Sequence, residues 1–267
     1  MHINNKQFTG NWAVILGGSS GFGLAAVEKL ASHGMNIAVL YRETAVSERI
    51  LKQNLAKLAE ENSITIAPFN INALDTKARA SFIQNLSTLA ANHSVKLLLH
   101  SIARGNLKPL VADDKNDELS IDDIQLTTYA MATSILDWAR DLLKAEMFNA
   151  DARIIGLTSE GADKYWEGYA AVSIAKSSLE SLNTYMAVEL SKYGIKTNLI
   201  QAGITETPSL MRIPGSEKLL ETAINRNPFG RMTKPGDVAN VIYLLCTDEA
   251  AWINGTVIHV DGGEHCR

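Results

Sequence analysis

The amino-acid sequence predicts one Rossmann-type α/β domain over residues 1–267, a doubly wound parallel sheet of about seven strands with helices on both faces. Short apolar runs bounded by Gly, Asn, Asp or Pro alternate with longer amphipathic segments. Such alternation produces parallel sheets through right-handed crossovers. The first apolar run also ends in a glycine-rich turn that opens a helical pattern, which is typical of a dinucleotide-binding unit.

Each element follows from its hydrophobic period. The apolar runs predict strands at 12–17, 36–41, 64–69, 95–102, 152–158, 195–201 and 256–260. The amphipathic patterns predict helices at 22–33, 44–62, 75–92, 121–148, 169–193 and 235–247. Two segments, 104–120 and 205–227, break the alternation after strands, where open α/β sheets bind ligands. We expect 205–227 to be a substrate-binding lid and the acidic run of 104–120 to be a solvated surface.

Composition excludes several classes of protein. The 46% apolar and 20% charged fractions are those of an ordinary globular domain. The net charge of −4 argues against nucleic acid or an anionic membrane as the main partner. No apolar run approaches the ~18 residues of a membrane-spanning helix, and residues 1–11 lack a signal-peptide core. Because Cys246 and Cys266 form no disulfide framework, we expect a cytoplasmic location.

The glycine turn after the first strand has the spacing GxxxGxG. Glycines let the backbone approach a pyrophosphate, and the N-terminus of the following helix supplies N–H groups and a positive dipole end. The turn residues that we expect to contact the cofactor are Gly17, Ser19, Ser20, Gly21, Phe22 and Gly23.

The end of the second expected strand bears on the choice of cofactor. An acidic residue there would bind the ribose 2′-hydroxyl of NAD, but this chain has Tyr41 and Arg42. A guanidinium matches a 2′-phosphate in shape and charge, which favours NADP(H). Because Glu43 follows, NAD(H) remains an alternative, and Arg42 as an exposed strand-end charge is a second one.

Tyr169 and Lys176 are the candidate catalytic pair. Seven residues is close to two helical turns, so the two side chains project from nearly the same face of the helix expected at 169–193. A nearby ammonium favours phenolate, so we expect Lys176 to lower the pKa of Tyr169 towards working pH. The alternative is an ordinary amphipathic surface.

Across nearly its whole length the chain resembles the short-chain dehydrogenase/reductase family. The glycine turn resembles the family's TGxxxGxG, with Leu16 in place of Thr. The segment AGITET at 202–207 resembles its PGxxxT, with Ala202 in place of Pro, and GTVIHVDGG near the end resembles its closing strand and turn.

The catalytic spacing departs from most of that family. Val172 stands four residues before Lys176, where the family usually has its Tyr, so the spacing here is Y-x6-K. That spacing, and HSIA at 100–103 in place of NNAG, resemble the bacterial enoyl-[acyl-carrier-protein] reductases, a divergent branch. The stretch SEGADKYWEGYAAVSIAK resembles the NADPH-using type III subgroup, which keeps a Ser ten residues and a second Tyr four residues before the Tyr, here Ser159 and Tyr165. The HSIA stretch looks more like the commoner type of enoyl reductase than like the type III subgroup.

This resemblance implies reduction of a 2-enoyl thioester in fatty acid biosynthesis by a homotetramer. The thioester would be carried by acyl carrier protein or coenzyme A, and no metal is expected. Hydride delivery to C3 leaves negative charge on the thioester oxygen, so a site needs a donor aimed at that oxygen. We assign this role to Tyr169, and we expect Lys176 to hold the cofactor ribose. Ser159 either assists or caps its loop, and Tyr165 is a second donor or a wall of the acyl channel.

Further cofactor contacts follow from the same resemblance. The residues expected at the adenosine and nicotinamide ends are Tyr41, Arg42, Asn70, Ile71, Ser101, Ile102, Ala103, Lys176, Gly203, Ile204 and Thr207. We expect His100 to be a buried, hydrogen-bonded strand-end residue without a catalytic role.

Two other functions remain open. One is a carbonyl or alcohol oxidoreductase of the same fold, for example a 3-oxoacyl thioester reductase, in which Tyr169 protonates an alkoxide. Val172, and the absence of Asn from TTYAMATS at 127–134, count against it. The other is a non-catalytic NADP(H)-binding protein, which the retained Tyr169 and Lys176 oppose.

Overall fold

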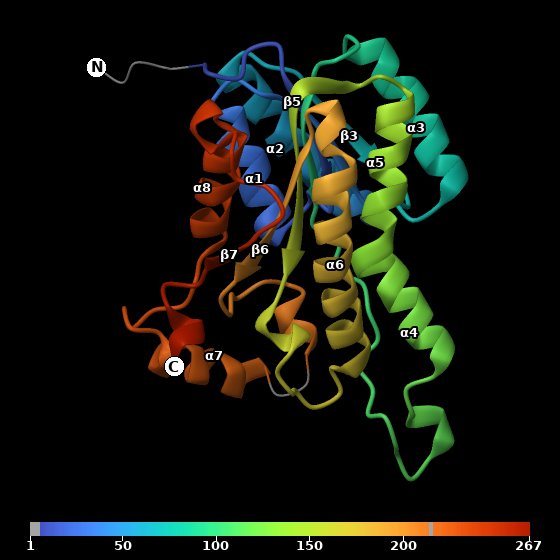
Figure 1. The fold of residues 1–267 in the computed structure, drawn as a ribbon, viewed down its shortest axis with the longest axis vertical. Coiled ribbons are helices and arrows are strands. Elements are labelled where there is room, and N and C mark those ends of the chain that lie inside the picture. The colour runs from blue at the N-terminus through green and yellow to red at the C-terminus, as the bar shows by residue number, and fades with distance from the viewer. Residues whose placement is uncertain (1–5, 214–215) are drawn as a thin grey trace.

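A computed structural model describes residues 6–213 and 216–267. Within these ranges one parallel sheet has the strand order β3-β2-β1-β4-β5-β6-β7, which confirms the predicted fold class (Figure 1). The strands are β1 (Trp12–Leu16), β2 (Asn36–Tyr41), β3 (Ile66–Asn70), β4 (Val95–His100), β5 (Phe148–Thr158), β6 (Lys196–Ala202) and β7 (Val257–Val260). The order reverses between β1 and β4, and the crevice beyond such a switch point is the usual ligand site of an open α/β sheet.

Helices cover both faces of the sheet (Figure 1). They are α1 (Gly21–Ala31), α2 (Ala45–Asn62), α3 (Thr76–Leu89), α4 (Ile121–Thr128), α5 (Ser134–Lys144), α6 (Ala170–Glu189), α7 (Ser216–Arg226) and α8 (Pro235–Cys246). Side chains of β1 alternate between two buried clusters: Val14 packs with α3, α5 and α6, whereas Ile15 packs with α1, α2 and α8. Burial on both faces explains why β1 is continuously apolar.

The long helix expected at 121–148 is interrupted and ends early. A π-helical turn, η2 (Tyr129–Thr133), separates α4 from α5, and α5 ends at Lys144. Phe148 belongs to β5, because it pairs with Val95 of β4 in the parallel ladder. The sequence prediction extended the helix to Phe148 because a single apolar residue fits a helical pattern as well as the start of a strand.

Both excursions lie at the carboxyl edge of the sheet, as expected. Residues 104–120 leave β4 and contain only a short 3₁₀ turn, η1 (Lys115–Asp117), before α4. The segment 205–227 follows β6 and contains η5 (Leu210–Arg212) and α7. Figure 1 shows α7 beyond the ends of β6 and β7, beside the last turn of the chain. Pro214 of the expected lid lies outside the described residues.

The helices differ in how their N-termini are closed. Side chains cap α2, α3 and α4: Thr44 accepts from the Ser47 N–H, Asp75 from the Ala78 N–H, and Ser120 forms a capping box. Ser20, the N-cap residue of α1, makes no such bond. The first turn of α1 therefore keeps N–H groups that its own cap does not use, and it follows the glycine turn.

Candidate active site

The glycine turn brings the ends of β1 and β4 together. Gly17 has φ +86°, and a Cβ there would lie 2.4 Å from the carbonyl oxygen of Ser101. A Cβ on Gly23 would lie 2.1 Å from the carbonyl oxygen of Gly17. No side chain fits at either position, so the turn leaves bare backbone beside the uncapped start of α1. This cradle fits a pyrophosphate.

The loop after β6, which we expect at the nicotinamide, lies against the glycine turn. A Cβ on Gly21 would lie 3.5 Å from Thr207, so the loop and the glycine turn face each other. Gly203 is tightly enclosed, because a Cβ there would lie 2.4 Å from Thr233 Oγ1 and 2.9 Å from Glu264 Oε2. The structure thus gathers the glycine turn, Ser101 and the 203–207 loop at one edge, as the sequence predicts.

The residues that we expect at the adenosine end of the cofactor differ in their exposure and contacts. Arg42 is exposed and stays available to a 2′-phosphate. The Tyr41 side chain is 3% exposed and packs with α1 and α2, so the expectation that it contacts the cofactor is wrong for this side chain. Burial, with the charge of Glu48, raises the pKa of Tyr41 to about 12.

Asn70 has a different task from the one expected beside the adenine. Its Oδ1 accepts from the Glu43 N–H at 3.1 Å, and its Nδ2 donates to the Glu43 carbonyl at 3.0 Å. The same Nδ2 donates to Glu48 at 3.0 Å. The amide therefore fixes the backbone directly after Arg42, which holds the β2–α2 loop in place.

Tyr169 is the N-cap residue of α6 and not part of the helix. Its hydroxyl lies 3.5 Å from Ser159 Oγ, at the end of β5. Gly161 makes room for the ring, since a Cβ there would lie 2.5 Å from Tyr169 Cε1. Sequence reasoning missed Gly161, because its value lies in a contact across the loop and not in any motif.

Lys176 is buried on the second turn of α6 and points back to β5. Its Nζ donates to the Leu157 carbonyl at 2.7 Å. Burial lowers the pKa of Lys176 to about 8, against the opposing charge of Glu180. The expectation that Lys176 lowers the pKa of Tyr169 is wrong for this structure: burial raises the Tyr169 pKa, and only the Ser159 hydrogen bond opposes it. Tyr169 is therefore a neutral hydrogen-bond donor at physiological pH.

The Lys176 pKa makes a prediction about pH dependence. If the ammonium is the working form, kcat/KM for the cofactor falls above a pH of about 8. Fold stability changes in the opposite direction. Because the folded pKa lies below the ordinary value of 10.5, the unfolded chain binds more protons between these values, and stability rises with pH there. Steady-state rates and thermal unfolding measured from pH 6 to 10 check this, and a flat kcat/KM would contradict it.

Tyr165 and His100 do not lie beside the Tyr169 hydroxyl in the way that Ser159 does. Tyr165 is 88% exposed, so the structure does not bring it to the Tyr169 hydroxyl as a donor or as a channel wall. His100 is buried and bonds through Nε2 to Ser134 Oγ at 2.9 Å, which confirms that it is a buried, hydrogen-bonded residue at the end of its strand. Burial, and then the charge of Lys176, lower its pKa to about 3, so it stays neutral.

An apolar cluster that the sequence did not reveal flanks Tyr169. Val172 and Ala175 of α6 pack against Ala130 and Met131 of η2, and the Tyr169 ring and Leu107 lie on this cluster. On the lid, Met211 is 51% and Ile224 is 42% exposed. The expected closing of this lid over an acyl chain stays a prediction.

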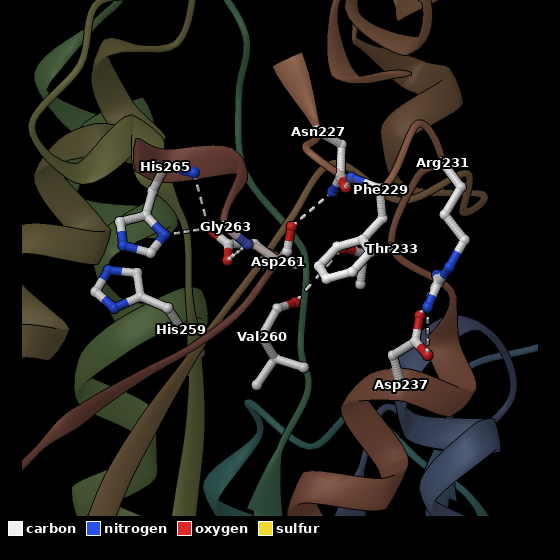
Figure 2. A pocket seen from close by; sticks show the side chains of 11 residues that line it. Asn227, Phe229, Arg231, Thr233, Asp237, His259, Val260, Asp261, Gly263 and His265 are labelled. Carbon is white, nitrogen blue, oxygen red and sulfur yellow. Dashed lines mark hydrogen bonds and ion pairs between the residues drawn. The ribbon is translucent and has the colours of Figure 1, made fainter. Parts of the chain in front are cut away.

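A cavity of about 390 Å³ lies elsewhere, at the turn after β7 (Figure 2). Figure 2 shows His265 bonded to Asp261, with His259 beside it, and Arg231 bonded to Asp237. Neither Tyr169 nor Lys176 lines this cavity, so it is separate from the proposed chemistry. In the described ranges no group of His, Cys, Asp and Glu has a metal-binding arrangement, and no helix is long and apolar enough to cross a membrane.

Comparison with known proteins decides the family. A family model described as "Enoyl-(Acyl carrier protein) reductase" matches residues 17–265. The chain belongs to this family of short-chain dehydrogenases/reductases. It is therefore an oxidoreductase of a family that binds a nicotinamide cofactor, in agreement with the cradle at Gly17 and Gly23.

Individual relatives of this short-chain dehydrogenase/reductase differ in activity. It is 33% identical over 175 residues to the NADH-type enoyl-[acyl-carrier-protein] reductase of Aquifex aeolicus, a match that spans 64% of this chain and 63% of the relative. It is 26% identical over 267 residues to a tropinone reductase homolog of Arabidopsis thaliana, across 98% and 96% of the two chains. The Aquifex enoyl reductase crystal structure superimposes with a TM-score of 0.82 at 23% identity, covering 97% and 98%, which shows the shared fold.

Proposed function

We propose that this protein is an enoyl-thioester reductase that uses NADP(H) to reduce a 2-enoyl thioester, carried by acyl carrier protein or coenzyme A, in fatty acid biosynthesis. One observation carries the proposal: the Tyr169 hydroxyl lies at the end of β5, beside Ser159, with buried Lys176 seven residues further on in α6. The match to an enoyl reductase of Aquifex aeolicus supports it.

The cofactor, when bound, supplies the hydride for C3 of the substrate. The chain then has to hold the negative charge that develops on the thioester oxygen. Tyr169 meets this need as a neutral donor, because burial keeps its proton on the phenol. Lys176, whose Nζ now donates to the Leu157 carbonyl, would hold the ribose hydroxyls of the bound cofactor.

Val172 separates this proposal from ordinary carbonyl reduction. It stands where carbonyl-reducing relatives have their Tyr, is 4% exposed and packs in the cluster beside Tyr169. A valine there has no proton to give. The apolar surroundings of Tyr169 suit an acyl chain, because they exclude water from the reacting atoms.

The preference for NADP(H) rests on Arg42. The side chain is exposed at the end of β2, and Asn70 fixes the backbone that follows it. A 2′-phosphate would gain a charge-assisted hydrogen bond from this guanidinium. The Aquifex relative is named for NADH, so both cofactors have to be tested.

The decisive experiment follows cofactor absorbance with four pairs of reagents. Crotonyl-thioester and acetoacetyl-thioester are each supplied with NADPH and with NADH. We expect oxidation of NADPH with the crotonyl substrate at a kcat/KM at least about tenfold above the acetoacetyl substrate. The reverse order would instead support a carbonyl reductase, which the tropinone reductase homologs favour. Cofactor binding without turnover on either substrate would support a non-catalytic protein.

We also propose that the chain forms a homotetramer. The outer side of α6 carries Tyr185 and Val188, which are 65% and 71% exposed, and α8 carries Leu244 at 55%. The two helices cover opposite faces of the sheet, and exposed apolar side chains on such helical surfaces are suited to contacts between copies. Light scattering of the purified protein measures the mass, and a monomer at micromolar concentration would contradict the proposal.

A further inference from the structure

Arg226, the last residue of α7, joins three separate segments through one guanidinium. Its Nη1 and Nη2 donate to the two carboxylate oxygens of Glu160 at 2.9 and 2.7 Å. Its Nη2 also donates to the Glu264 carbonyl at 3.1 Å, and its Nε to the Arg267 carbonyl at 3.2 Å. A bidentate pair of this kind fixes both direction and distance.

Two partners of Arg226, Glu160 and Glu264, adjoin parts of the proposed active site. Glu160 directly follows Ser159 and opens the 3₁₀ turn η3 (Glu160–Ala162), which contains Gly161 beneath the Tyr169 ring. The Glu264 side chain is 2% exposed, and its Oε2 would lie 2.9 Å from a Cβ on Gly203. One side chain therefore connects the loop that carries the catalytic hydroxyls to the loop expected at the nicotinamide.

The next residue strengthens the connection to the closing turn. Asn227 is buried, and its Nδ2 donates to the Asp261 carbonyl at 2.7 Å (Figure 2). Its Oδ1 accepts from the Phe229 N–H at 2.9 Å. The end of α7 is thus fixed by two adjacent residues, of which only Arg226 reaches the catalytic loop.

Burial and charge make the Arg226–Glu160 pair sensitive to substitution. The side chains of Arg226 and Glu160 are only 20% and 16% exposed, so water shields the pair less than an ion pair on the open surface. The hydrogen bonds from Arg226 hold the pKa of Glu160 below its ordinary value. Loss of the guanidinium leaves the half-buried Glu160 carboxylate with Lys164 alone, and we expect the turn to move outward.

We propose that Arg226 is a positioning residue, which holds the Ser159–Tyr169 loop at the distance from the Gly203–Thr207 loop that hydride transfer requires. This inference rests on the proposed function for its kinetic readout. Misplacement of a catalytic group by about 1 Å costs up to about 100-fold in rate, so a small movement of this loop is enough to register.

The test compares Arg226→Gln with a matched control, Arg231→Gln. Arg231 also forms an ion pair, with Asp237 at 2.7 Å, but that pair does not reach the catalytic loop. We expect Arg226→Gln to lower kcat on crotonyl-thioester about tenfold or more, with the Kd for NADPH changed less than about twofold. Arg226→Lys keeps the charge and loses the bidentate geometry, so its kcat should lie between those of Arg226→Gln and the wild type. Arg231→Gln should retain the wild-type kcat.

Glu160→Gln and the double variant complete the cycle. If the two side chains act through each other, the double variant loses no more kcat than either single variant. Additive losses, or a kcat for Arg226→Gln within about twofold of wild type, would overturn the proposal. If Arg226→Gln does not fold, Glu160→Gln and Arg226→Lys carry the same comparison.

Amide hydrogen exchange separates this proposal from the proposed function. We expect faster exchange in residues 159–169 of Arg226→Gln, and no change there in Arg231→Gln. Each protein is measured at the same interval below its own thermal midpoint. Unchanged exchange in 159–169 would overturn the positioning role. If the wild-type protein does not turn over crotonyl-thioester, the proposed function fails, while the exchange result still decides whether Arg226 holds the loop.

Discussion

Tyr169→Phe is expected to lower kcat at least about tenfold, which corresponds to about 1.4 kcal/mol of transition-state stabilisation. The substitution removes one hydroxyl and keeps the ring that fills the space beside Gly161. That hydroxyl lies 3.5 Å from Ser159 Oγ, and its loss leaves the charge on the thioester oxygen without its proposed partner. Because the substitution leaves the glycine turn unchanged, the Kd for NADPH should stay within about twofold.

Two companion variants sharpen this result. Tyr193→Phe makes the same change in the 3₁₀ turn that follows α6, where the residue is 47% exposed, and should leave kcat unchanged. Ser159→Ala removes the bond to Tyr169 and should cost less than Tyr169→Phe. Stopped-flow and steady-state rates on crotonyl-thioester measure all three. A Tyr169→Phe enzyme at full speed would show that another group stabilises the oxygen.

Gly23→Ala is expected to weaken NADPH binding at least about tenfold and to cost about 1–3 kcal/mol of folding free energy. An added Cβ would lie 2.1 Å from the Gly17 carbonyl oxygen and 3.1 Å from Gly18 Cα. Both neighbours are backbone, so they have no rotamer by which to move aside. The turn itself has to open, and with it the backbone cradle that fits the pyrophosphate.

Gly236→Ala is the matched control for this prediction. Gly236 also lies in the first turn of a helix, α8, but a Cβ there would meet no atom within 4 Å. It should leave the cofactor Kd unchanged, and its stability should stay equal or rise, because Ala is a better helix former than Gly. Fluorescence titration with NADPH and thermal unfolding measure both effects. Normal binding by Gly23→Ala would place the pyrophosphate elsewhere.

Much of the site was predictable because its signals are local. The glycine spacing and the seven-residue step from Tyr169 to Lys176 are properties of one turn and one helix start, and the structure keeps both. The pKa of Tyr169 was predicted in the wrong direction. A spacing argument includes the charge of Lys176, whereas burial, which dominates here, depends on how the whole chain packs.

The sequence by itself determined the alternation of strands and helices, the edge of the sheet that carries the site and the family, since these depend on residue order and hydrophobic period. Only the tertiary structure decided that Gly161 seats Tyr169, that Asn70 fixes the loop after Arg42 and that Arg226 meets Glu160. Arg226 and Glu160 are 66 residues apart. Such contacts join segments that are far apart in the sequence, and the hydrophobic period of one segment does not indicate which other segment it will contact. The packing of the whole chain decides these contacts.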